Sequence, residues 1–88
     1  MTTHTLNIRL FIKSYCGWCH EAVDWLESRG LNFESIEVIS NPNGMHELVK
    51  LTGRDMTPSI EVNGEVLADF GVDELELWWR AKGFDKLD

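Results

Sequence analysis

The chain has 88 residues, and its 8 lysines and arginines against 15 aspartates and glutamates give a formal net charge of −7. Its length predicts one domain over residues 1–88, since chains divide into domains only beyond about 250 residues. The acidic balance argues against binding to nucleic acids or anionic membrane surfaces, which attract clustered lysine and arginine, and no apolar run approaches the ~18 residues of a membrane helix.

The first half of the chain predicts a strand, a helix and a second strand. Residues 6–12 are rich in β-branched and aromatic side chains and begin with alternation, which is typical of a strand. Residues 17–29 predict a helix with Gly30 at its C-terminal cap. Residues 32–39 predict a strand parallel to the first. The apolar positions of the helix recur at steps of three, one and three, at Cys19, Ala22, Val23 and Leu26.

The second half predicts a helix, a hairpin and a last helix. Asn41-Pro42 is typical of a helix start and Gly53 of its end. Asn63-Gly64 supplies the positive φ angles of a two-residue turn between strands at 59–62 and 65–68. The buried face of the earlier helix is predicted at Met45, Leu48, Val49 and Thr52, and that of the last helix, residues 72–82, at Leu75, Trp78 and Trp79. The order β-α-β-α-β-β-α predicts an α/β fold with a mixed sheet.

Cys16 and Cys19 are the only cysteines. A disulfide between them would close too short a loop to stabilise the fold much, and zinc would need a second pair of ligands. A redox-active dithiol remains. Cys16 would lie just before the first helix, where unpaired N–H groups and the helix dipole stabilise a thiolate, and Cys19 would face the core one turn later. We therefore expect an exposed attacking sulfur and a sheltered resolving sulfur.

Several segments resemble glutaredoxins, which are members of the thioredoxin-like superfamily. Residues 13–19 (Lys-Ser-Tyr-Cys-Gly-Trp-Cys) resemble the Lys-x-x-Cys-x-x-Cys segment of that family, and residues 53–58 (Gly-Arg-Asp-Met-Thr-Pro) match its Gly-Arg-x-x-x-Pro stretch. Asn63-Gly64 matches the hairpin turn, and residues 71–75 are similar to the Gly-x-Asp-Asp-Leu that opens the last helix. The resemblance implies a thioredoxin-like (glutaredoxin) fold, with a four-stranded mixed sheet flanked by three helices.

The resemblance also implies roles for individual residues. Cys16 would be the nucleophile and Cys19 the resolving thiol, facing a cis-proline at Pro58, while the Thr57 backbone would pair with bound glutathione or peptide. The glycine carboxylate of glutathione would be bound by Lys13 and Arg54, and its γ-glutamyl end by Val72 and Asp73. Tyr15 and Trp18 flank the nucleophile and could form an aromatic surface for docking substrates. No tightly bound cofactor or metal is expected.

Three departures from the family pattern affect the expected glutathione pocket. Gly17-Trp18 replaces the usual Pro-Tyr between the cysteines, and Met56-Thr57-Pro58 replaces Thr-Val-Pro. The family's Gly-Gly, which lets the backbone approach the ligand, is replaced by the longer segment 67–71 (Leu-Ala-Asp-Phe-Gly). Within it, Phe70 would either cover the pocket or pack beneath the last helix.

The main hypothesis is a dithiol thiol–disulfide oxidoreductase that reduces protein disulfides or glutathione mixed disulfides, with glutathione as co-substrate. One alternative is a redoxin recharged by thioredoxin reductase. Another is a glutathione-dependent carrier of a 2Fe–2S cluster, which Gly17 directly after the first cysteine suggests. Met1–Thr5 lacks the basic start and apolar core of a signal peptide, so we expect the protein in the reducing cytoplasm. We also expect a monomer.

Overall fold

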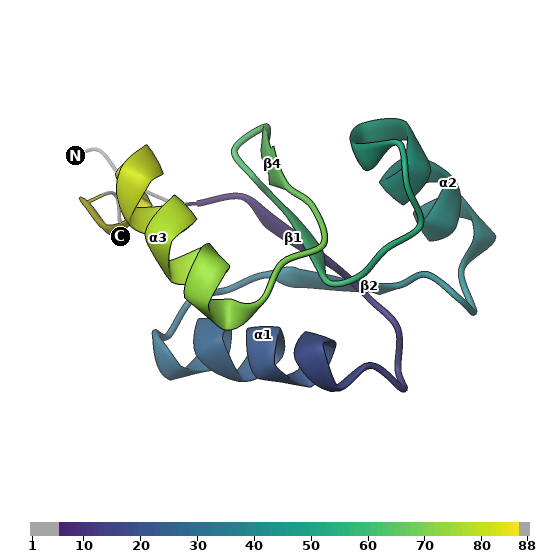
Figure 1. Cartoon of the computed structure of the whole chain (residues 1–88), viewed down its shortest axis with the longest axis horizontal. Helices are drawn as coiled ribbons and strands as arrows, with labels where there is room; N and C mark the ends of the chain where they lie inside the picture. Colours follow the sequence, from purple (N-terminus) through teal and green to yellow (C-terminus); the bar gives the residue numbers. More distant parts are fainter. Residues whose placement is uncertain (1–5, 87–88) are drawn as a thin grey trace.

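A four-stranded sheet forms the middle layer of the structure, a computed structural model that describes residues 6–86 (Figure 1). Its elements in chain order are β1 (Ile8–Ile12), α1 (Gly17–Ser28), β2 (Glu34–Glu37), α2 (Pro42–Thr52), β3 (Ser59–Val62), β4 (Glu65–Leu67), α3 (Val72–Lys82) and a short 3-10 helix, η1 (Phe84–Lys86). Helices α1 and α3 cover one face of the sheet and α2 the other. No helix within residues 6–86 is long and apolar enough to cross a membrane. Residues 1–5, on which the signal-peptide expectation depends, lie outside the described range.

The sheet is mixed, as the sequence predicts. In the strand order β2-β1-β3-β4, β1 is parallel to β2 and antiparallel to β3, and β3 is antiparallel to β4. Leu10 stands opposite Ile60, and Ile60 stands opposite Leu67 across the hairpin. Backbone φ angles of 51° at Asn63 and 88° at Gly64 form the predicted two-residue turn. The predicted element order and pairing directions are therefore confirmed.

The larger core lies between the sheet and helices α1 and α3. Trp79 of α3 is 2% exposed, and its ring packs edge-to-face at 5.2 Å, between centroids, against both Trp25 of α1 and Phe84 of η1. Phe70 is buried in the same cluster as Leu75, in agreement with packing beneath the last helix. Aromatic rings thus hold α3 against the sheet and α1.

Helix α2 faces the sheet through Leu48, with Met45 packed beside it, as predicted, but not through Val49. Gly44 and Leu48 are buried, whereas Val49, which we expected on the buried face, is 42% exposed. The helix approaches β2 closely: a Cβ atom on Gly44 would lie 2.6 Å from Cγ2 of Ile36. The prediction for Val49 was wrong because a glycine that packs through its backbone adds nothing to an apolar pattern.

Three of the four predicted strands are longer than those observed, whereas the strand predicted at 59–62 is confirmed as β3. The segments 6–12 and 32–39 shorten to β1 and β2, β4 ends at Leu67, and η1 was not predicted. After β2 the chain turns at once, because the Glu37 carboxylate accepts hydrogen bonds from both N and Oγ of Ser40 at 2.8 Å. Because the Glu37 side chain closes this turn, the strand ends at Glu37, although the apolar residues Val38 and Ile39 follow it.

Glu76 of α3 holds this helix against α1. Its Oε1 accepts hydrogen bonds from Nε1 of Trp25 at 3.2 Å and from Nη2 of Arg29 at 2.8 Å. These two contacts, with the one from Trp25 the larger, hold the pKa of the Glu76 carboxyl below its ordinary value. The contact fixes α3 relative to α1, and the N-terminal ends of these two helices form the walls of the candidate active site.

Trp79→Ala should lower the free energy of unfolding by about 3–5 kcal/mol, because it removes a buried ring and leaves a cavity. Urea unfolding followed by far-UV circular dichroism measures the change. Leu77→Ala is the matched control, since Leu77 lies on the same helix but is 70% exposed. It should change the free energy by less than about 0.5 kcal/mol. Equal losses in the two variants would contradict the described packing.

Candidate active site

Cys16 is the N-cap residue of α1. Its Sγ accepts a hydrogen bond from the backbone N of Cys19 at 3.2 Å, and its carbonyl oxygen accepts from the backbone N of His20 at the same distance. The side chain is partly exposed. A thiolate at this position is stabilised by the free N–H groups and the positive end of the helix dipole. The arrangement therefore suits a nucleophilic sulfur.

Cys19 occupies the first turn of α1 and points into the core, with 1% of its surface exposed. Burial raises the pKa of the Cys19 thiol above its ordinary value, and its contact with Cys16 acts in the same direction. The thiol therefore stays protonated at neutral pH. The two sulfurs are unequal, one accessible and one sheltered, as the sequence predicts.

The loop before Cys16 is held by a residue from the neighbouring strand. Oε2 of Glu37 accepts a hydrogen bond from the backbone N of Ser14 at 3.0 Å, and the carbonyl oxygen of Ser14 lies 3.1 Å from Nε2 of His20. The hydrogen bonds from Ser40 and then from Ser14 hold the pKa of the Glu37 carboxyl below its ordinary value. This carboxylate therefore ties β2 to the loop that presents Cys16.

The segment before β3 reaches Cys16 from the other side. The Thr57-Pro58 peptide bond is cis, and Sγ of Cys16 donates a 3.9 Å hydrogen bond to the carbonyl oxygen of Thr57. Buried Ser59 donates from its Oγ to the carbonyl oxygen of Met56 at 2.9 Å, which holds the turn. Backbone groups of Thr57 therefore stand next to the sulfur, where an extended substrate segment could pair with them.

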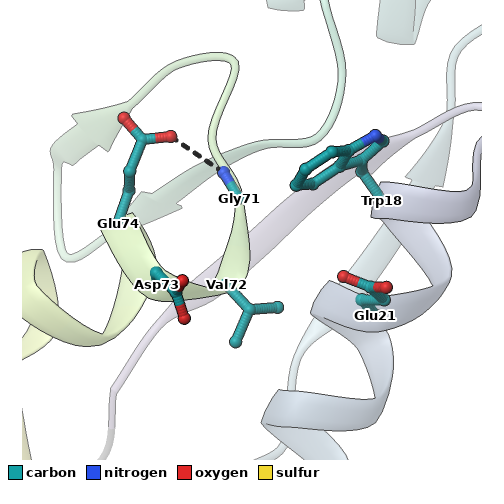
Figure 2. A pocket seen from close by; sticks show the side chains of 6 residues that line it. All are labelled: Trp18, Glu21, Gly71, Val72, Asp73 and Glu74. Carbon is teal, nitrogen blue, oxygen red and sulfur yellow. Dashed lines mark hydrogen bonds between the residues drawn. The ribbon is translucent and has the colours of Figure 1, made fainter.

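Two grooves meet at Trp18, whose side chain is 64% exposed. The first, of about 290 Å³, lies between the N-terminal ends of α1 and α3 (Figure 2). The second, of about 340 Å³, runs from Trp18 past Thr57 and Pro58 to Asp69. Within the described residues, carboxylates line both grooves but no lysine or arginine does.

Gly71 permits the close approach of Trp18 to the start of α3. A Cβ atom at this position would lie 2.9 Å from Cζ3 of the Trp18 ring. The backbone N of Gly71 donates to Oε1 of Glu74 at 3.0 Å, which Figure 2 shows at the edge of the first groove. The Glu74 carboxylate thus accepts the hydrogen bond of the N–H group at the N-cap of α3.

Some of the expected site residues come together here and others do not. Trp18 lines both grooves. Val72 and Asp73 line the first, and Thr57 and Pro58 line the second. Lys13, Tyr15 and Arg54 line neither, and Tyr15 is 74% exposed.

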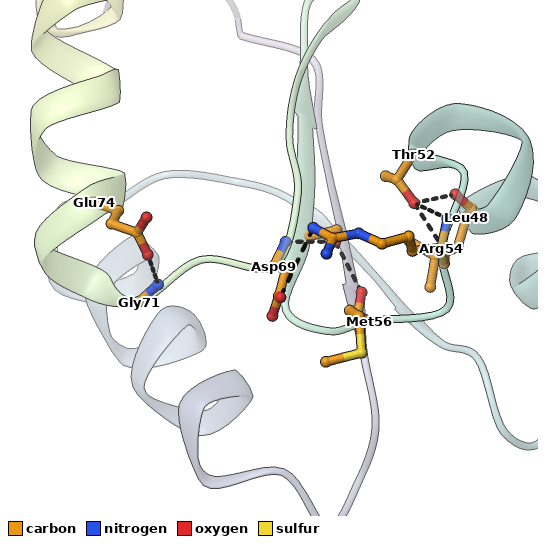
Figure 3. A network of polar contacts seen from close by, with 8 residues as sticks. Leu48, Thr52, Arg54, Met56, Asp69, Gly71 and Glu74 are labelled. Carbon is orange, nitrogen blue, oxygen red and sulfur yellow. Dashed lines mark hydrogen bonds and ion pairs between the residues drawn. The ribbon is translucent and has the colours of Figure 1, made fainter.

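Sequence reasoning missed Glu74 as a site residue and noted Asp69 only as part of the 67–71 departure that affects the expected glutathione pocket. Glu74 could have been found from the Gly71-x-x-Glu74 spacing, because a glutamate three residues after an N-cap folds back onto it. For Asp69 the sequence signal is the replacement of the family's Gly-Gly by the longer segment 67–71, which does not show which residue the carboxylate contacts. Figure 3 shows its carboxylate directed at Arg54, with Oδ2 3.8 Å from Nη2 of that arginine.

The site offers thiol ligands only at the two cysteines. Among residues 6–86, no group of three or more histidine, cysteine, aspartate or glutamate side chains could hold a metal ion. A Cβ atom built on Gly17, the residue after Cys16, would meet nothing within 4 Å, so the space beside Gly17 is open.

Comparisons with known proteins agree with this arrangement. The family model "Glutaredoxin" matches residues 8–67. Glutaredoxin 3 of Escherichia coli K12 is 28% identical over 81 residues, which cover 92% of this chain and 95% of the relative. A buckwheat glutaredoxin–glutathione complex superposes with a TM-score of 0.72 at 21% identity, covering 93% of this chain and 76% of that one. A glutaredoxin from Archaeoglobus fulgidus gives 0.71 at 14% identity, covering 81% and 83%. The thioredoxin-like fold predicted from the resemblance is confirmed.

Iodoacetamide should modify Cys16 faster than Cys19. At pH 7, Cys19→Ser, which keeps Cys16, should react at least about tenfold faster than Cys16→Ser, which keeps Cys19, because the thiolate is the reacting species. Since the Cys19 pKa is raised, its rate should climb only at a pH above the ~8.5 of a free thiol. Mass spectrometry over a pH series measures both rates, and equal rates at pH 7 would contradict the described asymmetry.

Proposed function

The chain belongs to the glutaredoxin family, and from this premise we propose that it is a dithiol thiol–disulfide oxidoreductase acting through Cys16 and Cys19. The observation that carries the proposal is the asymmetry of the pair. Cys16 is partly exposed at the helix N-cap, whereas Cys19 is buried with a raised pKa. This is the distribution that an attacking and a resolving thiol require.

The proposed reaction begins when the Cys16 thiolate attacks one sulfur of a substrate disulfide. A Cys16–substrate disulfide forms, and the other substrate sulfur leaves as a thiolate that takes up a proton. Cys19 then loses its proton and attacks Sγ of Cys16, which displaces the second substrate sulfur. The substrate gains two electrons, the protein is left with a Cys16–Cys19 disulfide, and a thiol reductant must reopen it. Such a cycle fits the reducing cytoplasm.

A glutathione mixed disulfide requires only the first cysteine. Cys16 would take the glutathionyl group while the substrate sulfur leaves as a thiolate and takes up a proton, and a second glutathione would then form glutathione disulfide and release the Cys16 thiolate. In this proposal the Thr57 backbone pairs with the peptide, because it lies beside Sγ of Cys16. Val72 and Asp73, which line the first groove, would contact the γ-glutamyl end. Lys13 and Arg54 would reach the glycine carboxylate from outside the grooves.

The charges of the grooves favour a second candidate that keeps the chemistry and changes the donor. Glutathione carries two carboxylates, whereas Asp69 and Glu74 line the second groove and Arg54 faces Asp69. Like charges in one groove disfavour each other. A redoxin recharged by thioredoxin reductase would have no need of a glutathione pocket.

A non-enzymatic alternative is a glutathione-dependent carrier of a 2Fe–2S cluster. The open space beside Gly17 supports it, because a second chain could approach Cys16 there. Anaerobic reconstitution with iron, sulfide and glutathione tests this alternative, and a colourless protein removes it.

Cys16→Ser should lower the turnover of both a protein disulfide and a glutathionylated peptide by about 10²-fold or more, because the nucleophile is lost. Cys19→Ser should abolish reduction of the protein disulfide, which needs two thiols, but retain turnover of the glutathionylated peptide. Steady-state assays of the two substrates measure these effects. A Cys16→Ser variant that still reduces either substrate would overturn the mechanism.

The electron donor should be identified by supplying one reductant system at a time. We expect turnover with glutathione, glutathione reductase and NADPH, recorded as loss of NADPH absorbance. If only thioredoxin reductase with NADPH sustains turnover, the glutathione-dependent version of the proposal is wrong and the second candidate holds. Cys16→Ser serves as the blank in both systems.

A further inference from the structure

Asp69 lies between Arg54 and the second groove. Asp69 lines that groove, and its Oδ2 lies 3.8 Å from Nη2 of Arg54 (Figure 3). Both side chains are partly exposed, so the guanidinium is paired without being buried. A substrate carboxylate that approaches Arg54 through this groove would meet Asp69 first.

The backbone of Asp69 is held in an unusual conformation. Its φ angle is +52°, a left-handed conformation that glycine adopts more readily than aspartate. Its N donates to Oγ of Ser59 at 3.1 Å, and the N of Phe70 donates to the carbonyl oxygen of Pro58 at the same distance. These bonds tie the 68–71 segment to the cis-proline segment and so fix where the Asp69 side chain begins.

The rest of the groove adds negative charge. Glu74 lines it as well, and the other lining residues are uncharged. An anionic group in the groove therefore meets two acidic residues. The guanidinium of Arg54, which contacts the lining residue Asp69, is already paired with it. A neutral or cationic group meets no such penalty.

We propose that Asp69 is a specificity-determining residue, which occupies Arg54 and selects against substrates that place a carboxylate in the second groove. The proposal rests on the proposed function, since it concerns the substrates of the same dithiol. It assigns as preferred substrates disulfide-bearing segments that are neutral or cationic next to the reacting sulfur. Glutathione is an anion, so it would bind more weakly than it would if Arg54 had no carboxylate of the protein beside it.

The test measures binding, so that it does not depend on turnover. S-methylglutathione carries the carboxylates of glutathione but cannot react with Cys16, and calorimetry or NMR titration gives its Kd. Asp69→Asn should lower this Kd about two- to fivefold at low salt, the range expected for one exposed charge pair. Asn also tolerates the positive φ angle. The gain should shrink at high ionic strength, because salt screens exposed charges.

Two further variants separate the pair from a general change in charge. In an Arg54→Gln background, Asp69→Asn should change the binding free energy of S-methylglutathione by less than half as much as it does in the wild-type protein. The reason is that Asp69 has lost its partner Arg54. Glu34→Gln removes the same unit charge from exposed Glu34 on β2, at the opposite edge of the sheet from β4, and should leave the Kd unchanged. Circular dichroism confirms that each variant is folded.

The outcomes distinguish this inference from the proposed function. A Kd that Asp69→Asn does not lower, including no binding to either protein, overturns the role of Asp69. An equal gain in Asp69→Asn and Glu34→Gln overturns it too. Failure of the wild-type protein to reduce any disulfide would overturn the proposed function instead, while the binding comparison would still decide whether Asp69 opposes a carboxylate.

Discussion

The hydrogen bond from the backbone N of Cys19 to Sγ of Cys16 joins the fold to the proposed chemistry. The N–H group of Cys19 needs a hydrogen-bond acceptor because it belongs to the first turn of a helix. The sulfur of Cys16 needs a donor because N–H groups at a helix start stabilise a thiolate. The bond depends on α1 starting at the correct residue. That start depends in turn on the loop after β1, which Glu37 holds from the neighbouring strand.

Reactivity and selectivity arise from different parts of the site. Backbone groups position the reacting sulfur: the N-terminal turn of α1 on one side and the carbonyl oxygen of Thr57 on the other. In the proposed function, side chains decide what can approach it. Trp18 and Glu74 line both grooves, and Asp69 adds a second acidic residue to the second groove. A shared backbone arrangement can therefore serve different substrates, because a change of one exposed side chain leaves the sulfur where it is.

Local patterns predicted the elements well where one residue determines the conformation. Asn63-Gly64 specified its turn because both positions adopt positive φ angles, and Gly53 ended α2 in the left-handed conformation. The pattern failed where packing decides. Val49 is apolar yet exposed, because the backbone of Gly44 takes the place against the sheet that a side chain was expected to fill. An apolar pattern records side chains and cannot record close backbone contacts.

By itself the sequence determined the order of the elements, the mixed sheet and the placement of the two cysteines at a helix start, since each follows from residues within a few positions of one another. The residues themselves did not show what surrounds the sulfur; the family resemblance implied Thr57 and Pro58 there, and only the tertiary structure decided the contacts. Thr57 lies 41 positions from Cys16, and Asp69 reaches Arg54 across 15 positions and two strands. Such pairs depend on how strands and loops assemble, and a carboxylate in the sequence does not show which guanidinium it will face.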